Sequence, residues 1–203
     1  MSSRQSAKRR TQGLAERAEA IVAAARELIV TDGLGGATIS RIAKVAGISE
    51  GGIYRHFSSR TEILVAVLES IYSQVRDLFR ASSTDDPVAD LRDLMRSNAR
   101  LMADPTRSFA RPWLEIVASA PDGPLRDKIT ELQAREFAPL EDLVERAKAS
   151  GQFRPDTDTD QLVWAVLTWA WGQNVISALA LNEPEHLRRS LVFIDQIIDS
   201  ARS

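Results

Sequence analysis

The stretch from residue 38 to residue 64 constrains the fold more than any other part of the chain. Thr38 can cap the N-terminus of a first short helix, in which apolar residues recur at helical spacing. Gly47 then supplies the left-handed backbone conformation that ends this helix. Ser49 can cap a second helix after a turn of only one residue. The pattern therefore predicts two short helices joined by a tight turn, which is a helix-turn-helix.

Two further signals make this turn rigid and place a third helix after it. Ile48, just before the cap, and Ile53, at the fourth helical position, have the spacing of a hydrophobic staple, which fixes the angle at which the chain enters the helix. Ser59 with Glu62 three residues later has the pattern of a capping box. It leads into an apolar run, from which we expect a long helix that ends near Ala81.

This stretch resembles the DNA-binding motif of the TetR family of one-component bacterial regulators. The resemblance lies in Thr38-Ile39, Ile42-Ala43, Ala46-Gly47-Ile48-Ser49, Gly51, Ile53-Tyr54, His56-Phe57 and Arg60-Thr61-Glu62-Ile63-Leu64. The spacing matches without a gap, which makes the resemblance far more specific than a single short motif. Gly52 departs from the pattern, because the family more often has a small residue with a side chain there. Each of the two adjacent glycines should cost the helix about 0.5 to 1 kcal/mol relative to alanine.

The resemblance implies that residues on or beside the two helices contact DNA. These are Thr38, Arg41, Lys44, Ser49, Glu50, Gly51, Gly52, Tyr54, Arg55, His56 and Arg60. In the family, the positions of Thr38, Tyr54, His56 and Arg60 are typical contacts to the DNA backbone. The base-facing positions are then Glu50, Gly51, Gly52 and Arg55. Arg55 could bind guanine through two hydrogen bonds, whereas Glu50 could accept from a cytosine amino group or simply complement the helix dipole.

The charge of the chain is unevenly distributed. Residues 1–60 contain ten Lys or Arg against five Asp or Glu, whereas residues 61–203 contain sixteen against twenty-three. Only the N-terminal part therefore suits a phosphate backbone. Residues 1–13 include the basic cluster Arg4, Lys8, Arg9 and Arg10 and no apolar periodicity. We expect them to be disordered, either as an arm that follows phosphates or enters a minor groove, or as a solvated tail.

The whole sequence predicts an all-α fold. A helix over about 14–31 should support the helix-turn-helix, so that residues 14–58 form the DNA-binding domain. Residues 59–203 contain further amphipathic segments separated by breaks at Asp85-Asp86-Pro87, Asp104-Pro105, Pro121-Asp122-Gly123-Pro124 and Gly151. Pro139 should kink one of these helices. The resemblance implies that this second part is a helical effector-binding and dimerisation domain.

Residues 161–182 contain no charge and hold three of the four tryptophans. Their length would permit a membrane span, but polar residues are spread around the helix and the flanks are acidic rather than basic. We therefore expect a helix that is buried on both sides, and no membrane partner. Pro184 opens a last helix with an apolar stripe. These two helices and their symmetry mates should form a four-helix dimer interface, which is also where the family dimerises. The residues expected at this interface are Trp169, Leu187, Leu191, Ile194 and Ile198.

The resemblance also implies a pocket for a small molecule, largely apolar, in the second domain. Candidate lining residues are Met95, Met102, Phe109, Trp113, Phe137, Trp164 and Trp171, with Asn98, Gln173 or Asn174 available to orient a polar group. Each could instead be an ordinary core residue, because aromatic and Met side chains on an apolar helical face usually are. Occupancy of the pocket should tilt the helix that begins after Ser59 and so move the recognition helices.

Composition excludes several other classes of protein. The chain has no cysteine, which rules out disulfides, thiolate catalysis and Cys-based zinc sites. His56 and His186 are its only histidines and lie far apart in sequence, so no catalytic triad and no His-based metal site is visible. We expect no enzyme and no cofactor. The first residues lack the apolar run of a signal peptide, which favours the cytoplasm.

A helical adaptor that binds another protein would explain residues 59–203 equally well. It would not explain a basic N-terminal part with a capped and stapled helix-turn-helix. We therefore expect a homodimeric, ligand-responsive regulator, more readily a repressor than an activator, that binds a palindromic operator in double-stranded DNA. Two such motifs related by a two-fold axis would contact half-sites about 34 to 36 Å apart, or a multiple of that distance.

Overall fold

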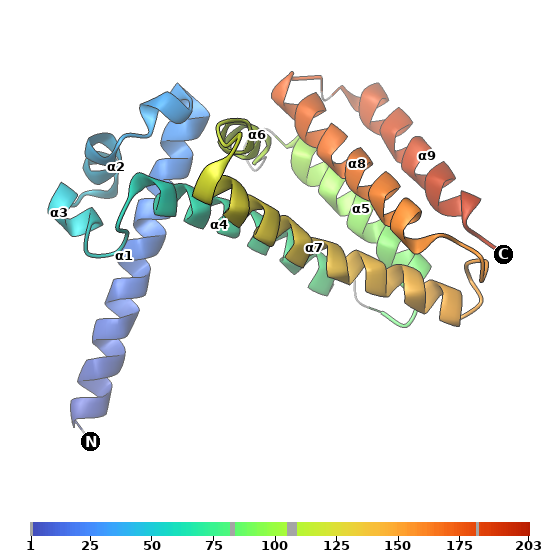
Figure 1. Ribbon diagram of the computed structural model, residues 1–203, viewed down its shortest axis with the longest axis horizontal. Helices are drawn as coiled ribbons and strands as arrows, with labels where there is room; N and C mark the ends of the chain where they lie inside the picture. Colours follow the sequence, from blue (N-terminus) through green and yellow to red (C-terminus); the bar gives the residue numbers. More distant parts are fainter. Residues whose placement is uncertain (1, 82–83, 105–108, 182) are drawn as a thin grey trace. The chain divides into compact units, whose positions relative to one another are not determined.

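The regular structure of the described residues is helical, with an isolated β-bridge between Phe153 and Arg202 (Figure 1). The computed structural model describes residues 2–81, 84–104, 109–181 and 183–203, without the side chains of residues 2–12, 81, 136 and 137. The helices divide between two compact units, each described by itself below. The first contains residues 1–70 and 115–129, and the second contains residues 71–114 and 130–203.

The first unit contains the predicted helix-turn-helix. Its helices are α1 (Ser2–Asp32), the 3-10 helix η1 (Leu34–Gly36), α2 (Ile39–Ala46), α3 (Glu50–Ile53) and the first part of α4 (Arg60–Ala81). Three predicted local signals are confirmed. The Thr38 hydroxyl accepts a hydrogen bond from Arg41 N, Gly47 has φ 69° at the C-cap of α2, and the Ser49 hydroxyl accepts from Gly52 N at 3.1 Å.

The capping box at the start of α4 is present with one change. Ser59 Oγ accepts a hydrogen bond from Glu62 N at 3.2 Å, as predicted. The Glu62 carboxylate reaches back to Ser58 N at 2.6 Å, one residue earlier than a standard box would require. The predicted end of this helix at Ala81 is confirmed.

The structure differs from the expectation of a disordered N-terminus, because α1 begins at Ser2 instead of near Leu14. Most residues of the segment are good or moderate helix formers, and Gly13 is the one residue with a strong preference against helix. Extending an existing helix costs far less than starting a new one, so the well-packed later part of α1 can propagate through Gly13.

The second unit is built from the rest of α4 and five further helices. These are α5 (Pro87–Ala103), α6 (Ala110–Ala118), α7 (Gly123–Ala149), α8 (Thr159–Ala178) and α9 (Pro184–Ser200), with parts of α6 and α7 assigned to the first unit. The predicted breaks separate them, apart from Pro105, which lies outside the described residues. Asp86 caps α5 by accepting hydrogen bonds from Val88 N and Ala89 N, and Pro139 lies inside α7.

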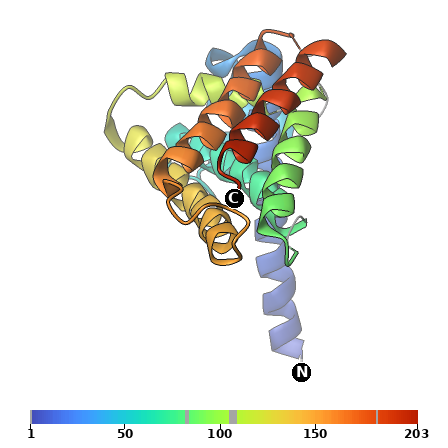
Figure 2. The same ribbon diagram turned by 90° about the vertical axis from the view of Figure 1, so that its right-hand side faces the viewer.

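The core of the second unit forms where α5, α8 and α9 lie side by side (Figures 1 and 2). Apolar side chains from these three helices and from α7 are buried together. Ion pairs also join α5 to α9: Arg92, whose side chain is only 16% exposed, binds Asp195 at 2.7 Å and also binds Asp199. The apolar stripe of α9 therefore packs inward, against helices of the same chain.

The structure differs from one sequence-based prediction. Trp169, Ile194 and Ile198, which were predicted to form the dimer interface, are buried in the protomer's own core, while Leu187 and Leu191 pack half-buried against it. Helix α8 is covered on one side within the chain, and Trp164 and Val175 on its other side are exposed, so its cover by a second copy stays a prediction. Periodicity identifies which residues of a helix are buried, but it does not say whether the covering element belongs to the same chain.

We expect Ile194→Ala to reduce the free energy of unfolding by about 2 to 5 kcal/mol, because the Ile194 side chain is 1% exposed and its removal leaves a cavity. Leu14→Ala is the matched control, since Leu14 is 48% exposed on α1 and its truncation should change stability by less than about 0.5 kcal/mol. Urea denaturation followed by circular dichroism measures both. Equal losses would contradict the burial of Ile194.

Candidate functional site

The helix-turn-helix exposes a polar surface on α2, α3 and the turn that follows. The exposed residues from the predicted DNA-contacting set are Thr38, Arg41, Lys44, Ser49, Glu50, Gly51, Tyr54 and Arg55, and His56 is half-buried. Tyr54 is 56% exposed, which is unusual for an aromatic side chain that belongs to a core. The Thr38 and Ser49 hydroxyls accept hydrogen bonds as helix caps and still have their own hydrogens to donate. This surface can therefore donate to phosphates through hydroxyl, phenol, ammonium and guanidinium groups.

The structure places Gly52 and Arg60 differently from the rest of the predicted set. Gly52 is buried within α3, close to the Ile48 and Ser49 side chains, and is not exposed as Glu50 and Gly51 are. The Arg60 guanidinium is turned inward, where Nε donates to the carbonyl of Ala37 at 2.8 Å and an Nη donates to the carbonyl of Leu34. Arg60 is thus a structural residue of the first unit.

The backbone of Leu34 is held from two directions within the first unit. Arg60, at the start of α4, binds its carbonyl, and the carboxylate of Glu115, on α6, accepts a hydrogen bond from its N–H. Asp32 at the end of α1 pairs with Arg41 on α2, so part of the charge of Arg41 is compensated in the free protein. The loop that leads into α2 is therefore fastened to both α4 and α6.

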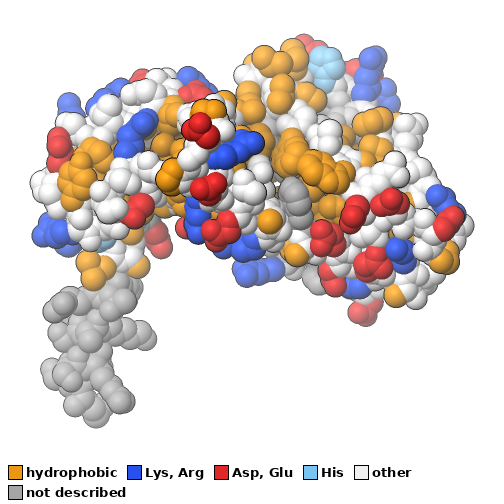
Figure 3. All heavy atoms as spheres, viewed as in Figure 1, with side chains coloured by type: hydrophobic (Ala, Val, Ile, Leu, Met, Phe, Trp, Pro, Cys, Tyr) orange, Lys and Arg blue, Asp and Glu red, His pale blue; other side chains and the backbone are white. Residues whose placement is uncertain are grey.

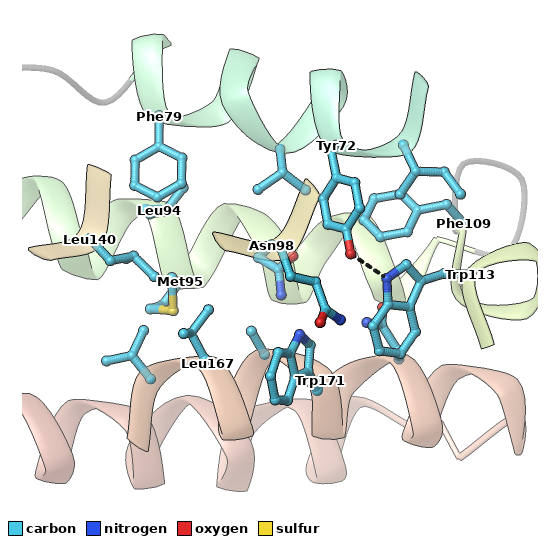
Figure 4. A pocket seen from close by; sticks show the side chains of 16 residues that line it. Tyr72, Phe79, Leu94, Met95, Asn98, Phe109, Trp113, Leu140, Leu167 and Trp171 are labelled. Atoms are coloured by element: carbon cyan, nitrogen blue, oxygen red, sulfur yellow. Dashed lines mark hydrogen bonds between the residues drawn. The ribbon is translucent and has the colours of Figure 1, made fainter. Parts of the chain in front are cut away.

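The second unit contains a cavity between α4, α5, α6, α7 and α8 (Figure 4). Its volume is about 80 Å³. On the same scale, a cavity that holds one water molecule has a volume of about 10 to 15 Å³. Among the described residues that line the cavity of the second unit there is no Lys, Arg, Asp or Glu. The walls are mainly aliphatic and aromatic, which is the usual composition of a site for a small organic molecule.

The aromatic side chains of the cavity form an ordered group. Trp113 Nε1 donates a hydrogen bond to the Tyr72 hydroxyl at 3.1 Å (Figure 4). The Trp113 ring stacks on Trp171, with centroids 6.5 Å apart and planes at 26°. Trp164 and Trp171 are in an edge-to-face contact, with centroids 5.8 Å apart and planes at 79°. Asn98, on α5, points toward Trp171 and Trp113.

The cavity contains only part of the set predicted to line it. Met95, Phe109, Trp113, Trp171, Asn174 and Asn98 are lining residues. Met102 is buried elsewhere in the core, Trp164 and Gln173 lie on an outer groove, and the side chain of Phe137 is outside the described residues. Sequence reasoning missed the wall formed by α4, which includes Ile71, Tyr72, Val75 and Phe79. Their helical spacing was a usable signal, but it did not distinguish a cavity wall from ordinary core.

A second feature of this unit is an apolar outer face on α8 and α9. Trp164 and Val175 on α8, Leu179 directly after it and Phe193 on α9 are each between 45% and 62% exposed. In Figure 3, hydrophobic side chains (orange) gather over this part of the surface. Between the two helices lies a groove of about 740 Å³. Nearby on α9, hydrogen bonds from Arg188 and Arg189 lower the pKa of Glu185 to about 2.

The described residues include no cluster of His, Cys, Asp or Glu with the geometry of a metal site. None of the described helices is both long and apolar enough to span a membrane.

Comparison with known proteins identifies the family. Residues 21–67 match the model of the bacterial regulatory proteins of the tetR family, and residues 81–189 match the model of the tetracyclin repressor-like C-terminal domain. The chain belongs to the TetR family. The first match covers the helix-turn-helix of the TetR-type regulator, and the second covers most of the unit that contains the cavity.

Individual TetR-family relatives match over different lengths. The transcriptional regulator TtgR of Pseudomonas putida is 36% identical over 84 residues, which is 41% of this chain and 40% of TtgR. The chain thus matches about two fifths of that relative. The repressor AcnR of Corynebacterium jeikeium is 24% identical over 201 residues, 92% of this chain and 94% of AcnR. A TetR-family structure from Rhodococcus superposes with a TM-score of 0.79 at 23% identity, covering 93% of this chain and all of that chain, which shows the same fold.

We expect Gly52→Ala to raise the free energy of unfolding by about 0.5 to 1 kcal/mol, because alanine favours the helix and the added Cβ meets Ile48 Cβ and Ser49 Oγ at an acceptable 3.4 Å. Gly47→Ala is the matched comparison. Its Cβ would meet nothing within 4 Å, but φ is 69°, so we expect a loss of about 1 to 2 kcal/mol. Thermal unfolding measures both variants. A loss at Gly52 as large as at Gly47 would show that the turn does not tolerate a side chain there.

Proposed function

We propose that this protein is a ligand-responsive transcriptional regulator that binds a palindromic operator as a homodimer and is released by a small, largely apolar effector. The observation that carries the proposal is the capped helix-turn-helix, with exposed hydroxyl, phenol and cationic groups on α2, α3 and the following turn. Membership of the TetR family supports it. Such a regulator works at the chromosome, in the bacterial cytoplasm.

The path of α4 and α6 supports a link between effector and DNA. At its start α4 carries Arg60, which binds the loop before α2, and further along it carries Tyr72, which lines the cavity. Helix α6 carries Trp113 in the cavity wall and, two residues later, Glu115, which binds Leu34. A molecule that displaces either helix would therefore also shift the loop before α2, because Arg60 and Glu115 are hydrogen-bonded to it. A coupling free energy of only about 1 to 3 kcal/mol is enough to switch binding.

The outer face of α8 and α9 is the proposed dimer interface. Exposed apolar patches of this kind usually mark a protein interaction site. Trp164, Val175, Leu179 and Phe193 would meet their symmetry mates across a two-fold axis, so that each patch covers the other. This replaces the inward-facing stripe of α9 as the dimer contact.

Repression is the form of regulation that this arrangement favours. An effector that changes the separation of the two α3 helices weakens binding to half-sites at a fixed spacing. Weakened binding relieves repression directly, whereas activation would require further contacts to the transcription machinery. The name of AcnR, a transcriptional repressor, points the same way.

Selection of binding sites from random duplex DNA tests the function. We expect the wild type to enrich a near-palindrome, and its affinity for that site to fall steeply with salt, because bound Lys and Arg release counterions from DNA. If no sequence is enriched and binding is weak at every salt concentration, the regulator proposal fails and a protein-binding adaptor becomes the better explanation.

The same selection separates the roles of two neighbouring residues. Tyr54→Ala and Arg55→Ala should each weaken operator binding by about 1 to 3 kcal/mol, but only Arg55→Ala should relax the base preference, because a guanidinium can read guanine. Arg80→Ala is the control: it removes the same charge from the far end of α4 and should change neither property. Equal weakening on every sequence by both variants would remove the base-reading role of Arg55.

A charge on the outer face should dissociate the dimer. We expect Phe193→Asp to yield folded monomers in sedimentation, with loss of operator binding, because a carboxylate would be buried without a partner at the interface. Leu14→Asp places the same charge at a comparably exposed apolar position on α1 and should leave the dimer intact. A dimer that survives Phe193→Asp would rule out this face.

A further inference from the structure

We propose that the cavity of the second unit selects an uncharged molecule, about the size of one substituted aromatic ring, that carries a hydrogen-bond acceptor such as a ketone oxygen. The acceptor is bound by the side-chain amide of Asn98. This inference rests on the proposed function and specifies the chemical class of the effector.

The side-chain nitrogen of Asn98 provides the main evidence. Asn98 is 9% exposed, and its Nδ2 is the one fully buried side-chain nitrogen or oxygen in the described part of the chain that has no hydrogen-bond partner. Buried polar groups are normally paired, because an unpaired donor has lost its water and gained nothing in return. Asn98 lines the cavity and points toward Trp113 and Trp171 (Figure 4). An acceptor in the cavity would supply the missing partner.

The lining of the cavity argues that the ligand carries no charge. The polar amide and hydroxyl side chains among the described lining residues are Tyr72, Asn98, Gln133 and Asn174, and all are neutral. A carboxylate or ammonium group placed there would be removed from water without an opposite charge among these described residues. The penalty for burying an unpaired charge is large compared with one hydrogen bond.

Size and shape narrow the class further. A volume of about 80 Å³, at about 10 to 15 Å³ for each water in the same measure, is room for roughly five to eight water molecules. This corresponds to one aromatic ring with a short substituent. The Trp113 and Trp171 rings lie stacked in the wall beside Asn98, and aromatic faces and edges favour another flat ring in offset or edge-to-face contact. A ketone next to such a ring would place its oxygen within reach of Nδ2.

A set of three probes of nearly equal size separates these requirements. Acetophenone has the ring and the ketone oxygen. In α-methylstyrene a CH₂ group replaces that oxygen, so the shape is kept and the acceptor is lost. Benzoate keeps the shape and carries a charge at neutral pH. Isothermal titration calorimetry on the full chain without DNA measures the affinity of each probe.

The decisive quantity is the ratio of the acetophenone affinity to the α-methylstyrene affinity, because changes in cavity shape affect both probes alike. We expect Asn98→Leu to lower this ratio at least ten-fold relative to the wild type. Asn174→Leu is the matched control: Asn174 is buried in the same cavity but contributes no unpaired buried atom, so the ratio should change less than three-fold. If Asn98→Leu does not fold, the same ratio is measured on Asn98→Ala, which removes the donor without adding volume.

Three results would overturn the inference. They are an unchanged ratio in the Asn98 variants, benzoate binding as tight as that of acetophenone, and no binding of acetophenone up to its solubility limit. Release of the selected operator is measured separately. If acetophenone binds through Asn98 but no operator can be selected, the proposed function fails and the cavity inference stands. If other molecules release the operator without dependence on Asn98, the cavity inference fails and the regulator stands.

Discussion

The hydrogen bonds from Arg60 to the carbonyls of Leu34 and Ala37 hold the start of α4 to the loop that leads into α2. The Leu34 carbonyl also accepts a hydrogen bond from Ala37 N at 3.2 Å, and a half-buried guanidinium is well suited to bind two neighbouring carbonyls because it offers several donors in a fixed plane. Glu115 completes the arrangement by accepting from the N–H of Leu34. The segment before α2 is thus held by two residues, Arg60 and Glu115, on helices that continue into the other unit.

Hydrogen bonds between different helices fix the packing inside the second unit. The hydrogen bond from Trp113 to Tyr72 fixes two large aromatic side chains from α6 and α4 at the cavity wall. Trp169 donates to the carbonyl of Ser190 and so ties α8 to α9. In an apolar interior such bonds specify one packing arrangement, since any other would leave the same groups unpaired. Asn98 is the exception, with a donor directed into the cavity.

Helix α8 carries apolar residues on two opposite sides. Its inward side, with Val163, Val166 and Leu167, is buried in the core of the unit, while Trp164, Val175 and Leu179 remain exposed on the other side. A helix with apolar residues all around needs a cover on both sides. Within the chain only one side is covered, and this imbalance is the physical basis for assigning the outer face to a second copy of the protein.

The sequence by itself determined the helices and, apart from the start of α1, most of their ends. Thr38, Gly47 and Ser49 specify the turn through contacts with residues at most four positions away, and such local interactions are legible in a linear pattern. The tertiary structure alone decided which side chains face each other across distant segments. It turned Arg60 and Gly52 inward, placed Ile194 in the protomer's core instead of an interface, and brought Tyr72 from α4 beside Trp113 from α6. These outcomes depend on how whole helices pack, because the same apolar stripe satisfies periodicity whichever neighbour covers it.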